Sequence, residues 1–464
     1  MKLNPTFTKL AILAVVTLLL CIVLNRIGGL AQERQWRQRD ALQNVEQSSA
    51  GPQALAGPLI ARACKESWPV PGAAGAKDSV DSRDFWLMAT PTRLEVTGGI
   101  SPEVRKRGLF KVNTYAGQLK LEARWDSLAS LVPKAEHPNS RLTCSDAVAL
   151  VALSDPRGIR AAELLRDGQA LTVRPGTTTP AFPGGLHAVL GDLRAEEGLT
   201  LSLRLGFVGT QRLGIVPAAG DTQVNLQSSW PHPSFTGQFL PVEHQVGVSG
   251  FTARWQVSSL ASTAVADLQS GKGLPALQRA ADVYGGDDVA PAATVNPAKS
   301  GLDVLAVELI DPVNPYVMSD RAIKYGLMFI ALTFLTVGLT ELLTGRRVHP
   351  VQYLFVGMAL SLFFLLLLSL SEHLPFLVAY VIAAAAAAGV LTPYAAAMLG
   401  GWWRGAAFGG GIALLYGALY VLLSREQTAL VIGAVLLFTV LAVVMTLTRR
   451  LDWYRLGGSV PAQA

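Results

Sequence analysis

Residues Val351 to Leu370 read VQYLFVGMALSLFFLLLLSL and contain no charged residue. The hydrocarbon core of a bilayer is about 30 Å thick, and a helix needs about 20 apolar residues to cross it. This stretch therefore predicts a membrane-spanning helix. Five other segments meet the same criterion, so we expect six transmembrane helices, one N-terminal and five C-terminal. In chain order the six segments are Leu10–Leu24 (or through Ile27 and Leu30), Tyr325–Leu343, Val351–Leu370, Leu374–Leu391 or beyond, Gly405–Leu423 and Thr428–Leu447. We expect Pro393 to kink or end the fourth helix.

Between the first and second segments lies a long stretch of ordinary globular composition. The whole chain is 50% hydrophobic and 16% charged, yet residues 32–320 are rich in charges and turns. We therefore predict an N-terminal transmembrane anchor (1–31), a β-rich exported domain (32–320), a five-helix transmembrane bundle (321–450) and a cytoplasmic tail (451–464). Residues 271–301, rich in Ala, Gly, Pro and Asp, indicate a long loop or an insertion within the exported domain.

Lysine and arginine residues in short loops indicate the orientation, because they remain on the cytoplasmic side. With the N-terminus in the cytoplasm, eight basic residues fall inside and one outside. The eight are Lys2, Lys9, Arg346, Arg347, Arg404, Arg449, Arg450 and Arg455, and the one is Arg425. We expect a multi-pass protein of a bacterial inner membrane, with both termini cytoplasmic and the large domain periplasmic.

The formal charge of +6 could suggest a nucleic-acid partner. The basic residues form no stripe with interleaved aromatic residues, and several end apolar segments. We therefore expect the lipid bilayer and an unidentified periplasmic or membrane protein as partners, and no nucleic acid.

The first apolar segment has a second interpretation. Gly29-Leu30-Ala31 resembles the small-x-small site at which a signal peptide is cleaved. Residues Gln32–Gln47, however, continue a helix-favouring pattern without a break, as expected for a helix that leaves the bilayer. We favour an anchor helix over a cleaved segment.

Alternation of apolar and polar residues predicts strands in the exported domain. It is regular from Leu199 to Phe207 and from Phe251 to Val257. The pair Ala116-Gly117 suggests a turn that joins Leu109–Tyr115 and Leu119–Arg124 in a hairpin. Many short strands separated by Gly and Pro predict a β-sandwich-like domain.

Three cysteines occur in the chain. Cys21 lies in the first apolar segment, whereas Cys64 and Cys144 both fall in the domain predicted to be exported. An oxidising compartment could pair these two in a disulfide. The alternative is two unrelated buried thiols.

No motif for a metalloprotease, a P-loop, a nucleophile elbow or a CxxC pair is present, and we expect no cofactor. Four places carry candidate functional residues. His232 stands between two prolines in Trp230–Phe235, which favours either a rigidly held base or a tight structural turn. Asp155 and Arg157 follow an apolar run, where the Asp155 carboxylate could hydrogen-bond a turn.

Glu341 is the acidic residue inside a predicted membrane segment. Its nearness to Arg346 and Arg347 favours an ion pair at the membrane surface over an ion site. Glu372 and His373 follow the charge-free helix, where lipid headgroups are expected. They could perform acid–base chemistry or simply form a short polar loop.

Several stretches resemble the CreD family of inner-membrane proteins. The resemblance covers nearly the whole chain and is strongest from Asp311 onward. The stretches that carry it are Ser154–Gly158, Trp230–Phe235, Pro315-Tyr316, Arg321–Tyr325, Phe329–Phe334, His349–Tyr353, Leu366–His373, Thr448–Arg450 and Asp452–Tyr454.

The resemblance implies a role in cell-envelope integrity linked to a two-component stress response, with no catalytic residues to carry over. The leading hypothesis is non-enzymatic sensing, binding or scaffolding in the periplasm. The alternative is an enzyme acting on envelope lipid or glycan at the membrane surface, with Glu372 and His373 as its reactive groups and His232 and Asp155 reaching toward them. Transport is disfavoured, because ionisable residues within the membrane segments are scarce.

Overall fold

The chain forms two compact units in the computed structural model, which describes residues 5–70, 79–191, 193–196, 198–274, 302–311, 314–344, 348–424 and 429–449. The helical unit comprises Met1–Arg39 with Val313–Ala464, and the β unit comprises Asp40–Pro312. Helix α1 (Pro5–Ser48) contributes residues to both units. The predicted tail 451–464 and most of the predicted loop 271–301 lie outside the described residues.

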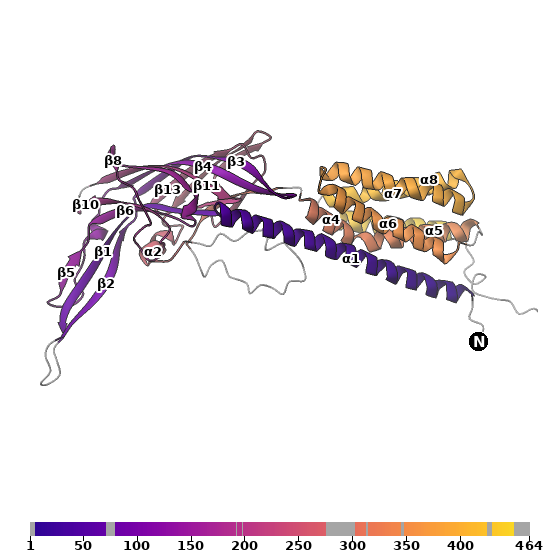
Figure 1. Cartoon of the computed structure of the whole chain (residues 1–464), viewed down its shortest axis with the longest axis horizontal. Coiled ribbons are helices and arrows are strands. Elements are labelled where there is room, and N and C mark those ends of the chain that lie inside the picture. The colour runs from indigo at the N-terminus through magenta and orange to yellow at the C-terminus, as the bar shows by residue number, and fades with distance from the viewer. Residues whose placement is uncertain are drawn as a thin grey trace, which may run out of the picture. The chain divides into compact units, whose positions relative to one another are not determined.

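The described helices of the helical unit correspond to the predicted apolar segments, except that α4 has no predicted counterpart. Besides the first part of α1, they are α4 (Pro315–Lys324), α5 (Gly326–Thr344), α6 (Pro350–Ser371), α7 (Phe376–Leu399), α8 (Trp402–Ser424) and α9 (Ala429–Thr448). Helices α5, α6, α7 and α8 run side by side in Figure 1.

Of the two outcomes predicted for Pro393, a kink or an end of the helix, the end is wrong, because α7 continues through Pro393 to Leu399. Membrane helices tolerate proline where neighbouring helices and small backbone adjustments satisfy the freed carbonyl group. The helix ends instead at Gly400, whose φ of 69° places it in the left-handed region that glycine adopts readily.

Four described helices are long and apolar enough to cross a membrane: Ala11–Ser48, α6, α7 and α8. A fifth span results if α4 and α5, which are bent by 43° at their junction, count as one. Helix α9 has a shorter apolar stretch, Val431–Thr446. The structure thus confirms several membrane helices, while the number six remains a prediction.

Small residues bring α7 and α8 close together. A Cβ on Gly405 would collide with the backbone of Ala396, and one on Gly409 would collide with Thr392. Small residues at this spacing let membrane helices approach closely.

The β unit consists of two sheets. The nine-stranded sheet has the order β14-β17-β12-β1-β6-β10-β9, with β2 and β5 also pairing with β1. Its strands are β1 (Gln53–Val70), β2 (Ser79–Ala89), β5 (Arg141–Cys144), β6 (Ala147–Leu153), β9 (Arg174–Pro175), β10 (Gly185–Gly191), β12 (Arg212–Ile215), β14 (Pro233–Gly237) and β17 (Leu305–Leu309).

The eight-stranded sheet has the order β15-β16-β13-β3-β4-β11-β7-β8. Its strands are β3 (Arg93–Arg107), β4 (Phe110–Trp125), β7 (Ile159–Arg166), β8 (Gln169–Leu171), β11 (Leu199–Thr210), β13 (Asp221–Ser228), β15 (Glu243–Gly247) and β16 (Gly250–Ser258). Among the described strands, β1 pairs in parallel with β12, and β3 with β13.

One hydrophobic core joins the inner faces of the two sheets. Leu203 of β11 and Trp255 of β16 meet Val151 of β6 and Val307 of β17 in a single cluster of buried side chains. The period-two patterns that predicted β11 and β16 are confirmed, because alternate residues of both strands are buried. On the other face of the nine-stranded sheet, α2 (Ala264–Gln269) packs into a second cluster.

The predicted hairpin at Ala116-Gly117 was wrong. Strand β4 runs unbroken through both residues, and the turn lies at Gly108-Leu109, between the paired residues Arg107 and Phe110. Gly117 serves packing instead, since a Cβ there would collide with the ring of Phe207 on the neighbouring strand β11.

Candidate functional site

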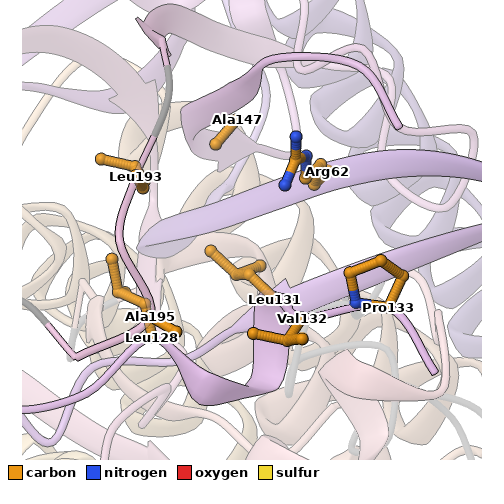
Figure 2. A pocket seen from close by; sticks show the side chains of 8 residues that line it. All are labelled: Arg62, Leu128, Leu131, Val132, Pro133, Ala147, Leu193 and Ala195. Carbon is orange, nitrogen blue, oxygen red and sulfur yellow. The ribbon is translucent and has the colours of Figure 1, made fainter. Parts of the chain in front are cut away.

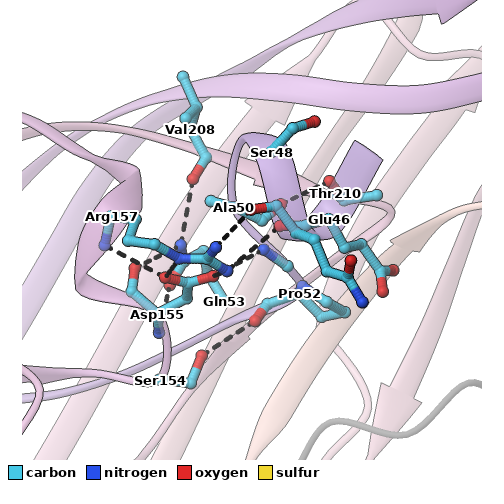
Figure 3. A network of polar contacts seen from close by, with 12 residues as sticks. Glu46, Ser48, Ala50, Pro52, Gln53, Ser154, Asp155, Arg157, Val208 and Thr210 are labelled. Carbon is cyan, nitrogen blue, oxygen red and sulfur yellow. Dashed lines mark hydrogen bonds and ion pairs between the residues drawn. The ribbon is translucent and has the colours of Figure 1, made fainter. Parts of the chain in front are cut away.

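The candidate pair Asp155 and Arg157 lies at the C-terminal end of α1, within the β unit. The last carbonyl groups of a helix lack intrahelical partners and carry partial negative charge, so a cation stabilises them. Arg157 supplies that cation: its Nη1 donates to the Gln47 carbonyl oxygen at 2.6 Å, and its Nη2 donates to the Glu46 carbonyl oxygen at 3.2 Å (Figure 3).

Asp155 holds this guanidinium in place. Arg157 donates to its carboxylate from Nε at 2.9 Å and from Nη2 at 2.6 Å. The Asp155 carboxylate also accepts from the backbone N–H of Arg157 at 3.1 Å and of Gly51 at 3.0 Å. Burial raises the pKa of Asp155, but these bonds outweigh it and hold the pKa below its ordinary value. The carboxylate is thus a fixed anion.

Two further side chains complete this arrangement. Gln53, which is fully buried, donates from Nε2 to the carbonyl oxygens of Asp155 and Val208 at 2.9 and 3.1 Å. Ser154 accepts from the Ala54 N–H at 2.8 Å and donates to the Pro52 carbonyl at 2.9 Å. We call Gln53, Ser154, Asp155 and Arg157 the α1 clamp, because together they fasten the end of α1 and the start of β1 to the turn after β6.

Glu372 has a partner that its sequence position did not suggest. It is the C-terminal cap residue of α6, and its carboxylate lies 3.2 Å from the Nε of Arg34 on α1. The Glu372 side chain is only 9% exposed. The neighbouring His373 is exposed, and its backbone N–H bonds the Leu370 carbonyl. Glu372 therefore fixes α1 to the end of α6.

Glu341 has an equivalent role elsewhere in the helical unit. Its carboxylate forms an ion pair with Lys9 of α1 and accepts from the Tyr353 hydroxyl at 3.1 Å. The predicted partners Arg346 and Arg347 lie outside the described residues. Glu341 thus joins α1, α5 and α6 through one carboxylate.

His232 lies in the turn before β14 and is exposed. Within the Trp230–Phe235 motif, the side chain that hydrogen bonds hold in place is that of Trp230. Its Nε1 donates to the carbonyl oxygens of His232 and Ile310, each at 3.0 Å. In the nine-stranded sheet β17, β12 and β1 separate β14 from β6, which places His232 roughly 19 Å from Asp155. The structure does not bring these two candidates together.

A polar cluster around Glu66 was not found from the sequence. The Glu66 side chain is fully buried, and its carboxylate accepts from the N–H groups of Glu136 and His137 at 2.9 and 3.0 Å and from the Ser140 hydroxyl at 2.8 Å. Arg83 donates to it at 3.1 Å. The His137 N–H and these other donors lower the pKa of Glu66 to about 2, against the effect of burial.

The disulfide lies two residues away from Glu66. Cys64 of β1 and Cys144 of β5 are bonded to one another and are direct cross-strand partners. The ring of Trp68 stacks on that of His137 with centroids 3.7 Å apart. The Glu66 cluster and the disulfide together fasten residues 136–144 to β1.

The β unit also contains a small apolar cavity of about 140 Å³ beside this region (Figure 2). Leu128, Leu131 and Leu193 contribute to its wall, and Arg62 lies at one side. The Arg62 Nε donates to the Ser145 carbonyl oxygen at 2.6 Å, so the guanidinium is held by the fold. Among the described residues no group of three or more His, Cys, Asp or Glu could hold a metal ion.

These features define a class: a membrane protein in which several apolar helices are combined with a large β-rich unit, joined by one long helix. The profile of the family described as inner membrane protein CreD matches residues 5–454. Inner membrane protein CreD of Escherichia coli K12 is 35% identical over 461 residues, which cover 97% of this chain and 94% of that protein. The chain belongs to the CreD family of inner-membrane proteins.

Proposed function

We propose that this protein supports the integrity of the cell envelope without catalysis, as a sensor or scaffold whose β unit faces the periplasm. A periplasmic partner that binds the β unit, or a mechanical force on that unit, would shift α1. The shift of α1 would in turn change the arrangement of the transmembrane helices. The observation that carries this proposal is the fastening of α1. It is one uninterrupted helix, and charged residues of both units bind it.

Within the helical unit, Lys9 and Arg34 of α1 pair with Glu341 and Glu372. Within the β unit, Arg157 binds the last carbonyl groups of the same helix. In this proposal α1, whose backbone is hydrogen-bonded along its length, carries a displacement from one unit to the other. A flexible linker would suit a protein whose two units act independently.

The disulfide supports a periplasmic β unit, since such bonds persist in oxidising compartments and are rare in the cytosol. The excess of basic residues in the loops assigned to the cytoplasm supports the same orientation. We propose six spans, with both termini in the cytoplasm.

Enzymatic action is the less favoured alternative. A general acid or base must be free to exchange its proton with a substrate. Arginine side chains hold the carboxylates of Asp155 and Glu372 instead. This supports positioning roles for both residues.

The proposal is tested by complementation of a strain that lacks the gene, scored by sensitivity to detergent and β-lactam, with membrane levels measured by blot. Asp40 is exposed on α1, so Asp40→Pro interrupts the helix while Asp40→Ala preserves it. We expect Asp40→Ala to protect like the wild type and Asp40→Pro to protect poorly at normal protein levels. Full protection by Asp40→Pro would refute coupling through α1.

Alanine variants of His232 and His373 test the enzymatic alternative in the same assay. Both side chains are exposed, so neither variant should affect folding. We expect both to protect fully. Loss of protection by either variant at normal levels would favour a reactive or ligand-binding site.

A further inference from the structure

The helical unit contains a groove between α1 and the bent pair α4–α5. Its volume is about 330 Å³, at the lower end of the range of about 300–1,000 Å³ usual for small-molecule sites. Two features open it. Gly28 and Gly29 place no side chain on this part of α1, and the axes of α4 and α5 differ by 43°. A Cβ on Gly29 would meet no heavy atom within 4 Å.

The groove has an apolar wall and a polar wall. Leu24 of α1 with Ile323 and Leu327 forms the apolar part. The amides of Asn25 and Gln32 belong to the polar part. Such a lining fits an amphiphile, whose chain and headgroup need different surroundings.

The position of the groove along α1 also supports an amphiphilic ligand. The groove runs along α1 from Cys21, inside the apolar run, to Gln32, in the polar continuation of the helix. A transmembrane helix changes from apolar to polar composition where it leaves the hydrocarbon core. The groove therefore spans the level at which a phospholipid changes from acyl chain to glycerol and headgroup.

The two charged residues that line the groove have opposite signs. Asp320 and Lys324 lie one turn apart on α4, with their carboxylate and ammonium groups 3.5 Å apart. The Asp320 side chain is 20% exposed and that of Lys324 is 58% exposed. A ligand with one anionic and one cationic group can pair with both, whereas a purely anionic ligand would meet the carboxylate of Asp320.

We propose that this groove binds one zwitterionic phospholipid with a primary ammonium headgroup. Lys324 pairs with the lipid phosphate and Asp320 with the lipid ammonium. Asn25 and Gln32 donate hydrogen bonds to phosphate or glycerol oxygens. The upper part of one acyl chain packs on Leu24, Ile323 and Leu327.

Native mass spectrometry of the full chain in detergent tests this proposal, with dioleoyl phosphatidylethanolamine and dioleoyl phosphatidylglycerol as the probes. We expect the wild type to retain one phosphatidylethanolamine in preference to phosphatidylglycerol. Gly29→Leu should fill the groove and reduce this retention about tenfold, which corresponds to the loss of about 1.4 kcal/mol. Gly389→Leu is the matched control, because a Cβ on this glycine of α7 also meets nothing within 4 Å.

Two charge variants test the headgroup assignment. Asp320→Asn should abolish the preference for phosphatidylethanolamine over phosphatidylglycerol, while Lys324→Gln should weaken retention of both lipids. Equal retention by the Gly29→Leu and Gly389→Leu variants would refute the site. Equal binding of both lipids by the wild type would refute the zwitterionic ligand. Circular dichroism of each variant verifies that the helices have formed.

Discussion

The Nε atom of Arg34 lies 3.2 Å from the carboxylate of Glu372, although the two residues are 338 positions apart in the sequence. The contact ties α1 to the C-terminal end of α6. The second ion pair, between Lys9 and Glu341, involves α1 about 25 positions earlier. At 1.5 Å per residue this spacing is about 37 Å, slightly more than the hydrocarbon thickness of a bilayer. Each pair can therefore lie near a membrane surface, where charges are tolerated.

A charge exchange tests the contact between Arg34 and Glu372. Glu372→Arg leaves two cations facing one another, and we expect it to destabilise the helical unit by about 1–3 kcal/mol. The double variant Arg34→Glu with Glu372→Arg should recover most of this loss. Thermal unfolding in detergent gives the measurement. A double variant no more stable than the single one would show that the attraction is not what joins these helices.

Removal of the Asp155 carboxylate should weaken the α1 clamp. Asp155→Ala leaves the Gly51 N–H without its acceptor and removes the carboxylate that holds the Arg157 guanidinium in place, and we expect a loss of about 2 kcal/mol in the free energy of unfolding of the β unit. Asp126→Ala is the control, since Asp126 forms an exposed ion pair with Arg124 and should cost less than about 0.5 kcal/mol. Urea unfolding monitored by tryptophan fluorescence compares them. Equal urea midpoints for Asp155→Ala and Asp126→Ala would contradict the stabilising role of the α1 clamp.

Acid should loosen the Glu66 cluster. The pKa of Glu66 falls from 4.5 to about 2 on folding, so its stabilising contribution is complete above pH 4.5 and is lost as the pH falls toward 2. Glu66→Gln should make the stability of the β unit less dependent on pH within this window. Thermal unfolding at several pH values gives the slope, and hydrogen exchange of residues 136–140 locates the change. If the stability of the variant depends on pH as steeply as that of the wild type, other carboxylates cause the acid sensitivity.

Reduction of the disulfide should destabilise the β unit substantially. The bond closes a loop across a sequence separation of 80, for which the chain-entropy argument gives about 4–5 kcal/mol. We expect Cys144→Ser to lower the unfolding midpoint markedly and Cys21→Ser to leave it unchanged. Thiol labelling of membranes before and after reduction counts the free cysteines. If Cys64 and Cys144 label without reduction, the periplasmic placement of the β unit loses its main chemical support.

Local patterns predicted the secondary structure well, because each element has a periodic signature. The apolar run Val351–Leu370 corresponds to α6, and the alternation from Leu199 corresponds to β11. The predictions were wrong where a residue type has two structural uses, as glycine does in turns and in close packing. Gly117 resembled a turn residue, but it gives space to Phe207 in the middle of a strand.

The sequence also assigned Asp155 to a turn, a role that the hydrogen bond from the Arg157 N–H confirms. It could not show that Arg157 binds the end of α1, since the two segments lie more than 100 positions apart. It likewise gave no signal for Glu66, whose neighbours on β1 are ordinary polar residues.

By itself, then, the sequence determined the long apolar helices such as α6 and α8 and the alternating strands β11 and β16, because hydrophobic period and run length are local properties of the chain. Only the tertiary structure decided which charges meet: Arg34 with Glu372, Lys9 with Glu341, and Glu66 with residues 136–140. An ion pair between distant segments depends on how whole helices and sheets pack, and packing has no signature in the neighbouring residues.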